Sequence, residues 1–348
     1  MYKRNPKFVH PELVHVLSTS KTRRLSWFEN LNVSHSNLAT ALNDLLEYAQ
    51  RGRNTRFIFL IGMTGVGKTS LAENALSTAL TVLWEEEEIE IPFMYVPVET
   101  NDEPRFAWKN LYSAILEQGS SIPVESVREG VCSGDIMRFS NNKRYTLAAL
   151  RKAIKRMAKE RGLKVIIFDE AYYFLRFSSL DVMDTVKSFA EQIDVKLIFI
   201  GSYELLKLAA QYSIQIRRTE VVPFFRYDPK KKNEMREFMT VIEKFTSNWP
   251  CDHIPNFLAA ADELAVASMG GVGQLSAILA NFLGIQLRNK GEIWTPEMFG
   301  KALKATGLDE EMREQIREGE AELRRKYAIK NGFCTNQGIA TIKEKLTS

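Results

Sequence analysis

Gly62-Met63-Thr64-Gly65-Val66-Gly67-Lys68-Thr69 is the stretch that decides the fold of this chain. It follows an apolar run at 57–61 and precedes a helix-forming stretch at 70–76. The glycines let successive backbone N–H groups converge on an anion at the N-terminus of a helix. A strand, a G-x-x-x-x-G-K-T loop and a helix in this order predict a phosphate-binding loop. We expect it to comprise Gly62, Met63, Thr64, Gly65, Val66, Gly67, Lys68, Thr69 and Ser70.

A second apolar run, at 164–168, ends in the adjacent carboxylates Asp169 and Glu170. Such a β-branched run is typical of a buried parallel strand. Lys68 is expected to reach the β- and γ-phosphates of a nucleoside triphosphate, while Thr69 and Asp169 hold Mg²⁺. Glu170 is placed to polarise an attacking water. Because an Asp-Glu pair favours hydrolysis over binding alone, the two motifs predict an ATPase with ATP and Mg²⁺ as cofactors.

The composition is that of an ordinary soluble protein. The chain has 348 residues, 45% of them hydrophobic and 26% charged, with a net charge of +4. No apolar run approaches the roughly 18 residues of a membrane span. The three cysteines are far apart, which fits reduced thiols in a cytoplasmic protein. The four histidines show no ligand spacing, so we expect no metal besides Mg²⁺. Because no apolar run is long enough to span a bilayer, we also expect no membrane partner.

Strand-forming and helical patterns alternate through the first two thirds of the chain. Strands are expected at 56–61, 92–98, 164–168, 195–200 and 219–223. Helical patterns between most of them predict an α/β fold with a parallel sheet. From these patterns we expect four parts: an irregular N-terminal arm at 1–40, a nucleotide-binding core at 41–226 with an insertion at about 101–145, a small helical lid at 227–308, and a charged helix with a C-terminal tail at 309–348.

Two further polar sites follow core strands. Ser202 comes directly after the strand at 195–200, next to the expected Asp169 strand, where a polar side chain would sense the γ-phosphate. The alternative is an ordinary Gly-Ser turn. Arg217 and Arg218 precede the last strand, and either is a candidate for an arginine finger that reaches the nucleotide of a neighbouring subunit. The alternative is a solvated pair of charges.

Basic residues gather around one predicted helix. Residues 143–161 hold eight Lys or Arg and one Glu, and the apolar residues among them define a single helix face. A solvated basic face explains this pattern as well as a nucleic-acid site does. If DNA passes nearby, these groups contact phosphates without reading bases. The candidate DNA-binding residues are Arg105, Lys109, Lys143, Arg144, Arg151, Lys152 and Lys155.

These motifs together resemble those of AAA+ ATPases, and more narrowly the TnsC/TniB group of transposition regulators, with MuB a more distant relative. The resemblance covers about residues 40–290. It rests on G-M-T-G-V-G-K-T, V-I-I-F-D-E-A, L-I-F-I-G-S, the arginine pair before V-V-P-F-F, and the turn G-G-V-G-Q-L at 270–275. It implies an AAA+ P-loop core with a C-terminal helical lid. One departure concerns the lid, where Gly273 or Gln274 stands in place of the arginine of initiator-type relatives.

The resemblance also implies a function in the prokaryotic cytosol. Proteins of that group assemble with ATP into rings or helical filaments on double-stranded DNA. They link a target-selection protein of TniQ/TnsD type to a transposase of TnsB type, and hydrolysis disassembles the filament. Two other interpretations stay open: a STAND-type signalling switch without DNA, and an initiator or helicase-loader ATPase.

Overall fold

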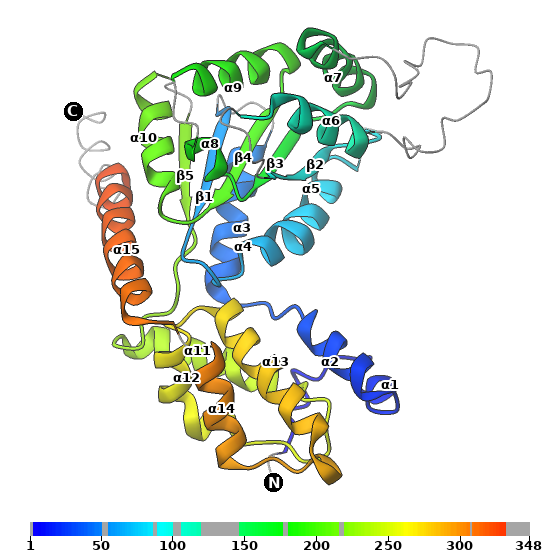
Figure 1. Cartoon of the computed structure of the whole chain (residues 1–348), viewed down its shortest axis with the longest axis vertical. Coiled ribbons are helices and arrows are strands. Elements are labelled where there is room, and N and C mark those ends of the chain that lie inside the picture. The colour runs from blue at the N-terminus through cyan, green and yellow to red at the C-terminus, as the bar shows by residue number, and fades with distance from the viewer. Residues whose placement is uncertain are drawn as a thin grey trace, which may run out of the picture. The chain divides into compact units, whose positions relative to one another are not determined.

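The computed structural model describes residues 3–50, 55–85, 89–99, 106–119, 146–176, 180–215, 219–306 and 308–331 (Figure 1). The chain forms two compact units. The sheet unit comprises Leu42–Ile61 and Thr69–Val222. The helical unit comprises Met1–Ala41, Gly62–Lys68 and Pro223–Ser348. The phosphate loop up to Lys68 therefore groups with the helical unit, while Thr69 begins the second segment of the sheet unit.

The sheet unit is built on five strands in the order β2-β3-β4-β1-β5. All five strands predicted from the sequence are present. The pairs β2–β3, β3–β4 and β4–β1 are parallel, as predicted. Every residue of β1 and β3 is buried, which explains why both read as continuous apolar runs. The strands are β1 (Phe57–Ile61), β2 (Phe93–Pro97), β3 (Val165–Asp169), β4 (Lys196–Gly201) and β5 (Thr219–Pro223).

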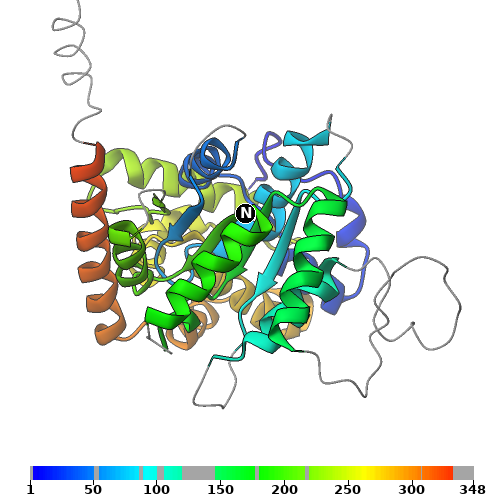
Figure 2. The same cartoon turned by 90° about the horizontal axis from the view of Figure 1, so that it is seen from above.

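Helices connect the strands of this sheet. The helix after the phosphate loop begins as α4 (Lys68–Ser70), passes through a π-helical turn at Leu71–Leu76 and continues as α5 (Ser77–Leu83). Helix α7 packs on α6 and α9, as the view in Figure 2 shows from above. Helix α3 (Ser36–Ala49) precedes β1, and its residues up to Ala41 belong to the helical unit. The other helices are α6 (Trp108–Gly119), α7 (Leu147–Arg161), α8 (Tyr173–Arg176), α9 (Leu180–Ile193) and α10 (Leu205–Gln215).

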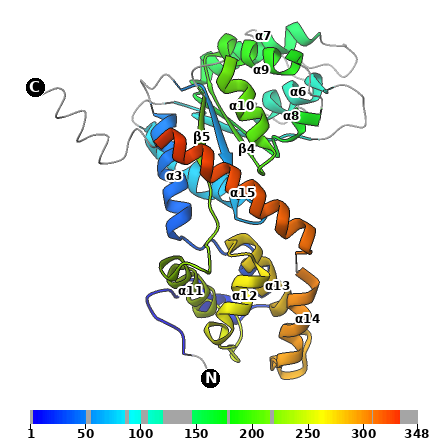
Figure 3. The ribbon, with the colours of Figure 1, turned by 90° about the vertical axis from the view of Figure 1, so that its left-hand side faces the viewer.

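The helical unit has an aromatic core. Trp249 is fully buried and lies 4.9 Å from Phe257 and 5.8 Å from Phe282, measured between ring centroids. Figure 3 shows the helices that supply this core. No helix in the described part of the chain has both the length and the apolar character needed to cross a bilayer. The helices are α11 (Lys232–Ser247), α12 (Ala261–Ala267), α13 (Val272–Arg288), α14 (Pro296–Thr306) and α15 (Glu310–Asn331), with 3₁₀ turns at Phe257–Ala260 and Lys290–Glu292.

The N-terminal segment is part of this core, so the prediction of an irregular arm is wrong over two helices. Helices α1 (Leu13–Leu17) and α2 (Lys21–Glu29) lie within it, and the Ser20 side chain caps α2. Phe28 is fully buried, with its ring centroid 5.0 Å from that of Trp249. The Arg24 guanidinium donates to both carboxylate oxygens of Glu292. The segment reads as irregular because its partners lie more than 200 residues away in sequence.

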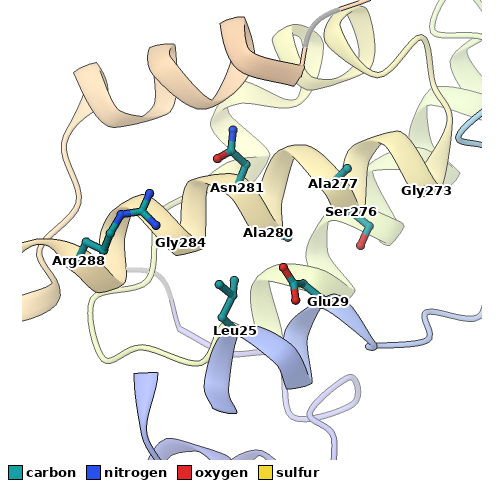
Figure 4. A pocket seen from close by; sticks show the side chains of 9 residues that line it. All are labelled: Leu25, Glu29, Gly273, Ser276, Ala277, Ala280, Asn281, Gly284 and Arg288. Atoms are coloured by element: carbon teal, nitrogen blue, oxygen red, sulfur yellow. The ribbon is translucent and has the colours of Figure 1, made fainter. Parts of the chain in front are cut away.

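Helices α2 and α13 also border a groove of about 530 Å³. Figure 4 shows Leu25 and Glu29 of α2 pointing toward α13, whose facing side carries the small residues Gly273, Ala277, Ala280 and Gly284. Without large side chains on that face, α13 leaves open space beside α2. The groove thus follows from the sequence of α13.

Helix α15 is held by a buried ion-pair network within the helical unit. The Glu320 side chain is buried and accepts hydrogen bonds from Arg226 at 2.6 Å and from Arg324 at 2.6 and 2.9 Å. Arg226 also donates to the Met269 carbonyl at 2.8 Å, and the Arg324 guanidinium lies 4.2 Å from the Phe225 ring centroid. A highly charged helix therefore docks through its charges as well as through the buried Leu323.

Burial of His35 makes the stability of the helical unit depend on pH. Burial, and secondarily the positive charge of Lys244, lowers the pKa of His35 to about 4. The His35 Nδ1 lies 3.1 Å from the Tyr227 hydroxyl, and the ring stacks on Phe224. Because the folded pKa lies below the unfolded value, this contribution is complete above about pH 6.5 and is lost as pH falls toward 4.

We expect His35→Gln to flatten this dependence. Between pH 7 and pH 5 the wild-type chain should lose about 2 kcal/mol more unfolding free energy than the variant. Denaturant unfolding followed by tryptophan fluorescence at a series of pH values measures the difference. Parallel pH curves for the two proteins would show that His35 is not the group responsible.

Candidate functional site: a phosphate loop and a carboxylate pair

The phosphate loop follows β1 directly and turns tightly on its glycines. Gly65 has φ 78° and Gly67 has φ 107°, which are left-handed conformations that favour glycine. Met63 and Val66 are both 1% exposed and anchor the loop in apolar surroundings. The Lys68 Nζ donates to the Gly62 carbonyl at 3.0 Å and to the Met63 carbonyl at 2.8 Å. The ammonium thus lies at the mouth of the turn, where phosphate oxygens can replace these carbonyl partners.

The glycine-rich turn before α13 packs against this loop within the helical unit. The Gln274 N–H donates to the Gly65 carbonyl at 2.6 Å. A Cβ at Gly273 would lie 2.7 Å from the Gly65 carbonyl oxygen and 3.1 Å from the Gly67 nitrogen, so only glycine permits this approach. Both positions predicted to replace a lid arginine therefore approach the phosphate loop, Gly273 closely and Gln274 through its backbone N–H. This contact provides a direct link from loop conformation to α13.

Thr69 and Asp169 meet within the sheet unit. The Thr69 hydroxyl donates to Asp169 Oδ2 at 2.8 Å, and the Glu170 N–H donates to Asp169 Oδ1 at 2.8 Å. Asp169 is 4% exposed at the end of β3. A hydroxyl and a carboxylate side by side are the hard oxygen ligands that Mg²⁺ prefers, so this pair fits the ion. When bound, Mg²⁺ would neutralise phosphate charge, and Thr69 and Asp169 are the residues that would hold it.

Tyr95 is a residue of this site that the sequence analysis missed. Its hydroxyl donates to Asp169 Oδ2 at 2.6 Å. Burial, followed by the hydrogen bond to Asp169, raises the pKa of Tyr95 above its ordinary value. Strand alternation was the available signal, because the neighbours Met94 and Val96 are buried while Tyr95 points to the opposite face. Only the register between β2 and β3 shows which carboxylate it reaches.

Glu170 has an unusual backbone conformation at the end of β3. Its φ of 53° places a non-glycine residue in the left-handed region, which costs of order 1–3 kcal/mol and clusters at functional sites. Two backbone hydrogen bonds hold this turn. The Glu170 carbonyl accepts from the Tyr173 N–H at 3.2 Å, and the Ala171 N–H donates to the Ile200 carbonyl at 2.9 Å. The exposed side chain thus leaves the sheet beside Asp169. Its role in activating water stays a prediction.

Ser202 lies at the same edge of the sheet as the carboxylate pair. It follows β4, which pairs in parallel with both β3 and β1. The Ser202 carbonyl accepts from the Leu205 N–H at 3.1 Å, so Ser202 also opens α10. The predicted neighbourhood of β3 and β4 is correct, and a sensor role for Ser202 stays a prediction. The finger candidates Arg217 and Arg218 lie outside the described residues.

The candidate DNA-binding residues have different surroundings. Lys152 and Lys155 of α7 and Lys109 of α6 are exposed. The Arg151 guanidinium, by contrast, donates to the Tyr112 hydroxyl at 2.9 Å and to the Thr185 carbonyl at 3.0 Å, so it holds α6, α7 and α9 together. The remaining candidates fall outside the described part of the chain; they are Arg105, Lys143 and Arg144.

Comparisons with known proteins agree with this geometry. Residues 50–209 match a family model described as an AAA domain. The chain is similar to the Aeropyrum pernix ORC1 protein in complex with DNA, with a TM-score of 0.54 and 17% identity over 80% of this chain and 68% of that chain. A Walker-type ATPase of Pyrococcus abyssi gives a TM-score of 0.49 at 16% identity, covering 83% of this chain and 75% of that one. No curated protein matches.

At such low identities the structural likeness establishes the fold alone. The five-stranded sheet in the order β2-β3-β4-β1-β5 matches the fold of AAA+ P-loop NTPases. The family match adds that the phosphate loop and the carboxylate pair lie in one AAA domain. Residues 50–209 of this chain therefore match an AAA domain, and the chain is an ATPase, which hydrolyses ATP to ADP and phosphate.

Proposed function

We propose that this chain is an ATP-dependent, DNA-binding regulator of DNA transposition that assembles as a ring or helical filament on double-stranded DNA. The observation that carries the ATP-dependent part is the contact of Thr69 with Asp169, directly beside Glu170. The sequence motifs that resemble the TnsC/TniB group support the role in transposition. In this role the chain links a target-selection protein of TniQ/TnsD type to a transposase of TnsB type.

In the proposed cycle, ATP completes the interface between adjacent copies. Lys68 binds the phosphates, and Arg217 or Arg218 of one copy reaches the nucleotide of the next. Glu170 then takes a proton from, or orients, the water that attacks the γ-phosphorus, and Ser202 helps to hold that water. Loss of the γ-phosphate removes the bridge between copies. Hydrolysis thereby makes the assembly temporary.

The basic face of α7 is the proposed DNA-contacting surface. Lys152 and Lys155 lie three residues apart on the exposed side of the helix, and Lys109 is exposed on the adjacent α6. Flexible ammonium groups bind phosphates as point charges and carry no base preference. Because Arg151 is engaged with Tyr112, the proposal rests on the lysines more than on that arginine. Binding should therefore be salt-sensitive and weakly specific.

We expect the double change Lys152→Glu and Lys155→Glu to weaken DNA binding in the presence of an ATP analogue by at least about tenfold, because two phosphate contacts become repulsive. The slope of log affinity against log salt concentration should also fall by about 2. Fluorescence anisotropy of a labelled duplex at graded salt measures both quantities.

The matched control changes Lys301 and Lys304, two exposed lysines of α14, to glutamate. This variant has the same net charge as the first but should bind DNA with nearly wild-type affinity and salt slope. Equal losses in both variants would show a general charge effect and would remove α7 from the interface.

An initiator or helicase-loader ATPase is the second candidate, because the chain is similar to an ORC1 protein whose structure was determined in complex with DNA. Strand transfer with a TnsB-type transposase and a TniQ/TnsD-type selector separates the two functions. A transposition regulator raises insertion in an ATP-dependent manner. An initiator binds DNA with ATP but leaves strand transfer unchanged. A STAND-type switch would neither bind DNA with ATP nor change strand transfer.

A further inference from the structure

The carboxylate of Asp169 accepts more hydrogen bonds than a simple Thr-Asp pair requires. Its Oδ2 accepts from the hydroxyls of both Thr69 and Tyr95, at 2.8 and 2.6 Å, and its Oδ1 accepts from the Glu170 N–H at 2.8 Å. A carboxylate has about four acceptor sites, so three hydrogen bonds fix its plane and still leave a site for a cation. The Tyr95 hydroxyl makes the shortest of the three contacts.

The sheet register explains how Tyr95 reaches this carboxylate. Pro97 of β2 pairs with Asp169 of β3, and Tyr95 pairs with Ile167. Residues two apart on a strand share a face, so Tyr95 is the diagonal neighbour of Asp169 on that face, at a distance that a tyrosine side chain spans. The backbone supports the same register, because the Val98 N–H donates to the Asp169 carbonyl at 3.0 Å. Two adjacent strands therefore hold the phenol and the carboxylate in place.

The two hydroxyls that donate to Oδ2 have different roles in the proposed site: Thr69 can also bind a cation, whereas Tyr95 only donates to the carboxylate. Thr69 follows Lys68 in the chain, and its oxygen has lone pairs that can bind a cation while its hydrogen still donates to Asp169. Tyr95 comes from β2, outside the phosphate loop, and its hydroxyl serves as a donor to the carboxylate. Hydrogen bonds of this kind orient metal ligands, and their loss typically costs about 10- to 100-fold in metal affinity or activity.

We propose that Tyr95 is a positioning residue of the ATPase site, which orients the Asp169 carboxylate so that it and the Thr69 hydroxyl together present their oxygens to Mg²⁺. Tyr95 touches neither nucleotide nor reacting atoms in this role. It acts through Asp169 alone. The inference concerns the nucleotide site of the AAA domain and does not depend on the proposed function in transposition.

The test is the Mg²⁺ dependence of nucleotide binding by full-length Tyr95→Phe, measured with a fluorescent ATP analogue and no DNA. The Mg²⁺ concentration at the midpoint should rise about 10- to 100-fold. Affinity for the analogue in EDTA should change by less than about twofold, because Lys68 and the loop are untouched. An unchanged midpoint, or an equal loss of binding with and without Mg²⁺, would overturn the proposal.

Tyr112→Phe is the matched control. Tyr112 is a tyrosine of the same unit and is more deeply buried than Tyr95, and its hydroxyl accepts from Arg151 rather than donating to Asp169. Its removal should leave the Mg²⁺ midpoint within about twofold of the wild type, whatever it does to stability. A shift as large as that of Tyr95→Phe would show that any lost tyrosine hydroxyl perturbs the site, which contradicts a specific role.

A double-mutant cycle tests whether Tyr95 acts through Asp169. Asp169→Asn by itself should raise the Mg²⁺ midpoint, because a neutral amide replaces the carboxylate. In that background Tyr95→Phe should add less than about a twofold shift, since the group that it orients is gone. Equal shifts in the two backgrounds would mean that Tyr95 acts independently of Asp169, and the proposal would fail.

Discussion

Lys68→Ala is expected to abolish ATP-dependent assembly on double-stranded DNA. The Lys68 ammonium lies at the mouth of the phosphate loop, against the carbonyls of Gly62 and Met63. Charge-assisted hydrogen bonds of this kind contribute about 1.5–3 kcal/mol each, so losing the ammonium should weaken ATP binding by at least about tenfold. The loss is measured by sedimentation with duplex DNA, at an ATP concentration that is just sufficient to saturate the wild-type chain.

Glu170→Gln is the matched comparison at the same site. The amide keeps the size of Glu170 but cannot act as a general base, so hydrolysis should fall by about 10²–10⁴-fold while ATP binding persists. Assemblies of this variant should therefore equal or outlast those of the wild type. Normal assembly by the Lys68 variant, or rapid disassembly by the Glu170 variant, would contradict the proposed cycle.

Gly270→Ala is expected to disrupt the helical unit next to the phosphate loop. Gly270 has φ 73°, and an added Cβ would lie 1.8 Å from the carbonyl oxygen of Tyr227. The Tyr227 N–H also donates to the Gly270 carbonyl at 3.0 Å, so the two segments cannot separate without losing that bond. Because backbone must move, we expect a loss of about 2–4 kcal/mol in unfolding free energy and weaker ATP binding.

Gly300→Ala serves as the control for that prediction. Gly300 lies in α14 and a Cβ there meets no atom within 4 Å. Alanine favours helix over glycine by about 1 kcal/mol, so this variant should be as stable as the wild type or slightly more so. Denaturant unfolding compares the two substitutions directly. If the Gly270 and Gly300 variants had the same unfolding free energy, the turn at Gly270 would accommodate a Cβ without loss of stability, and the prediction would be wrong.

The strands were predictable because each is a local signal. The apolar runs of β1 and β3 are buried along their whole length, and they lead into the two predicted motifs, the phosphate loop after β1 and the carboxylate pair at the end of β3. The sequence also predicted β4 beside β3, which brings Ser202 to the edge that carries Asp169. Periodicity and motif spacing suffice for features of this kind because they depend on neighbours in the sequence.

Contacts between distant segments were not predictable. Tyr95 and Asp169 meet through a strand register that no local pattern reveals. Helix α2 joins the aromatic core of the helical unit through Phe28, whose partner Trp249 lies far along the chain. The backbone contact of Gly273 with the phosphate loop likewise required the structure, although the glycine-rich turn itself was visible in the sequence.

Electron microscopy of the purified chain with double-stranded DNA tests the central claim most directly. One sample contains Mg²⁺ and a non-hydrolysable ATP analogue, and the other contains Mg²⁺ and ADP. We predict rings or helical filaments around the duplex with the analogue and dispersed protein with ADP. Monomers that ignore DNA with both nucleotides, or the same assemblies with ADP as with the analogue, would contradict the account.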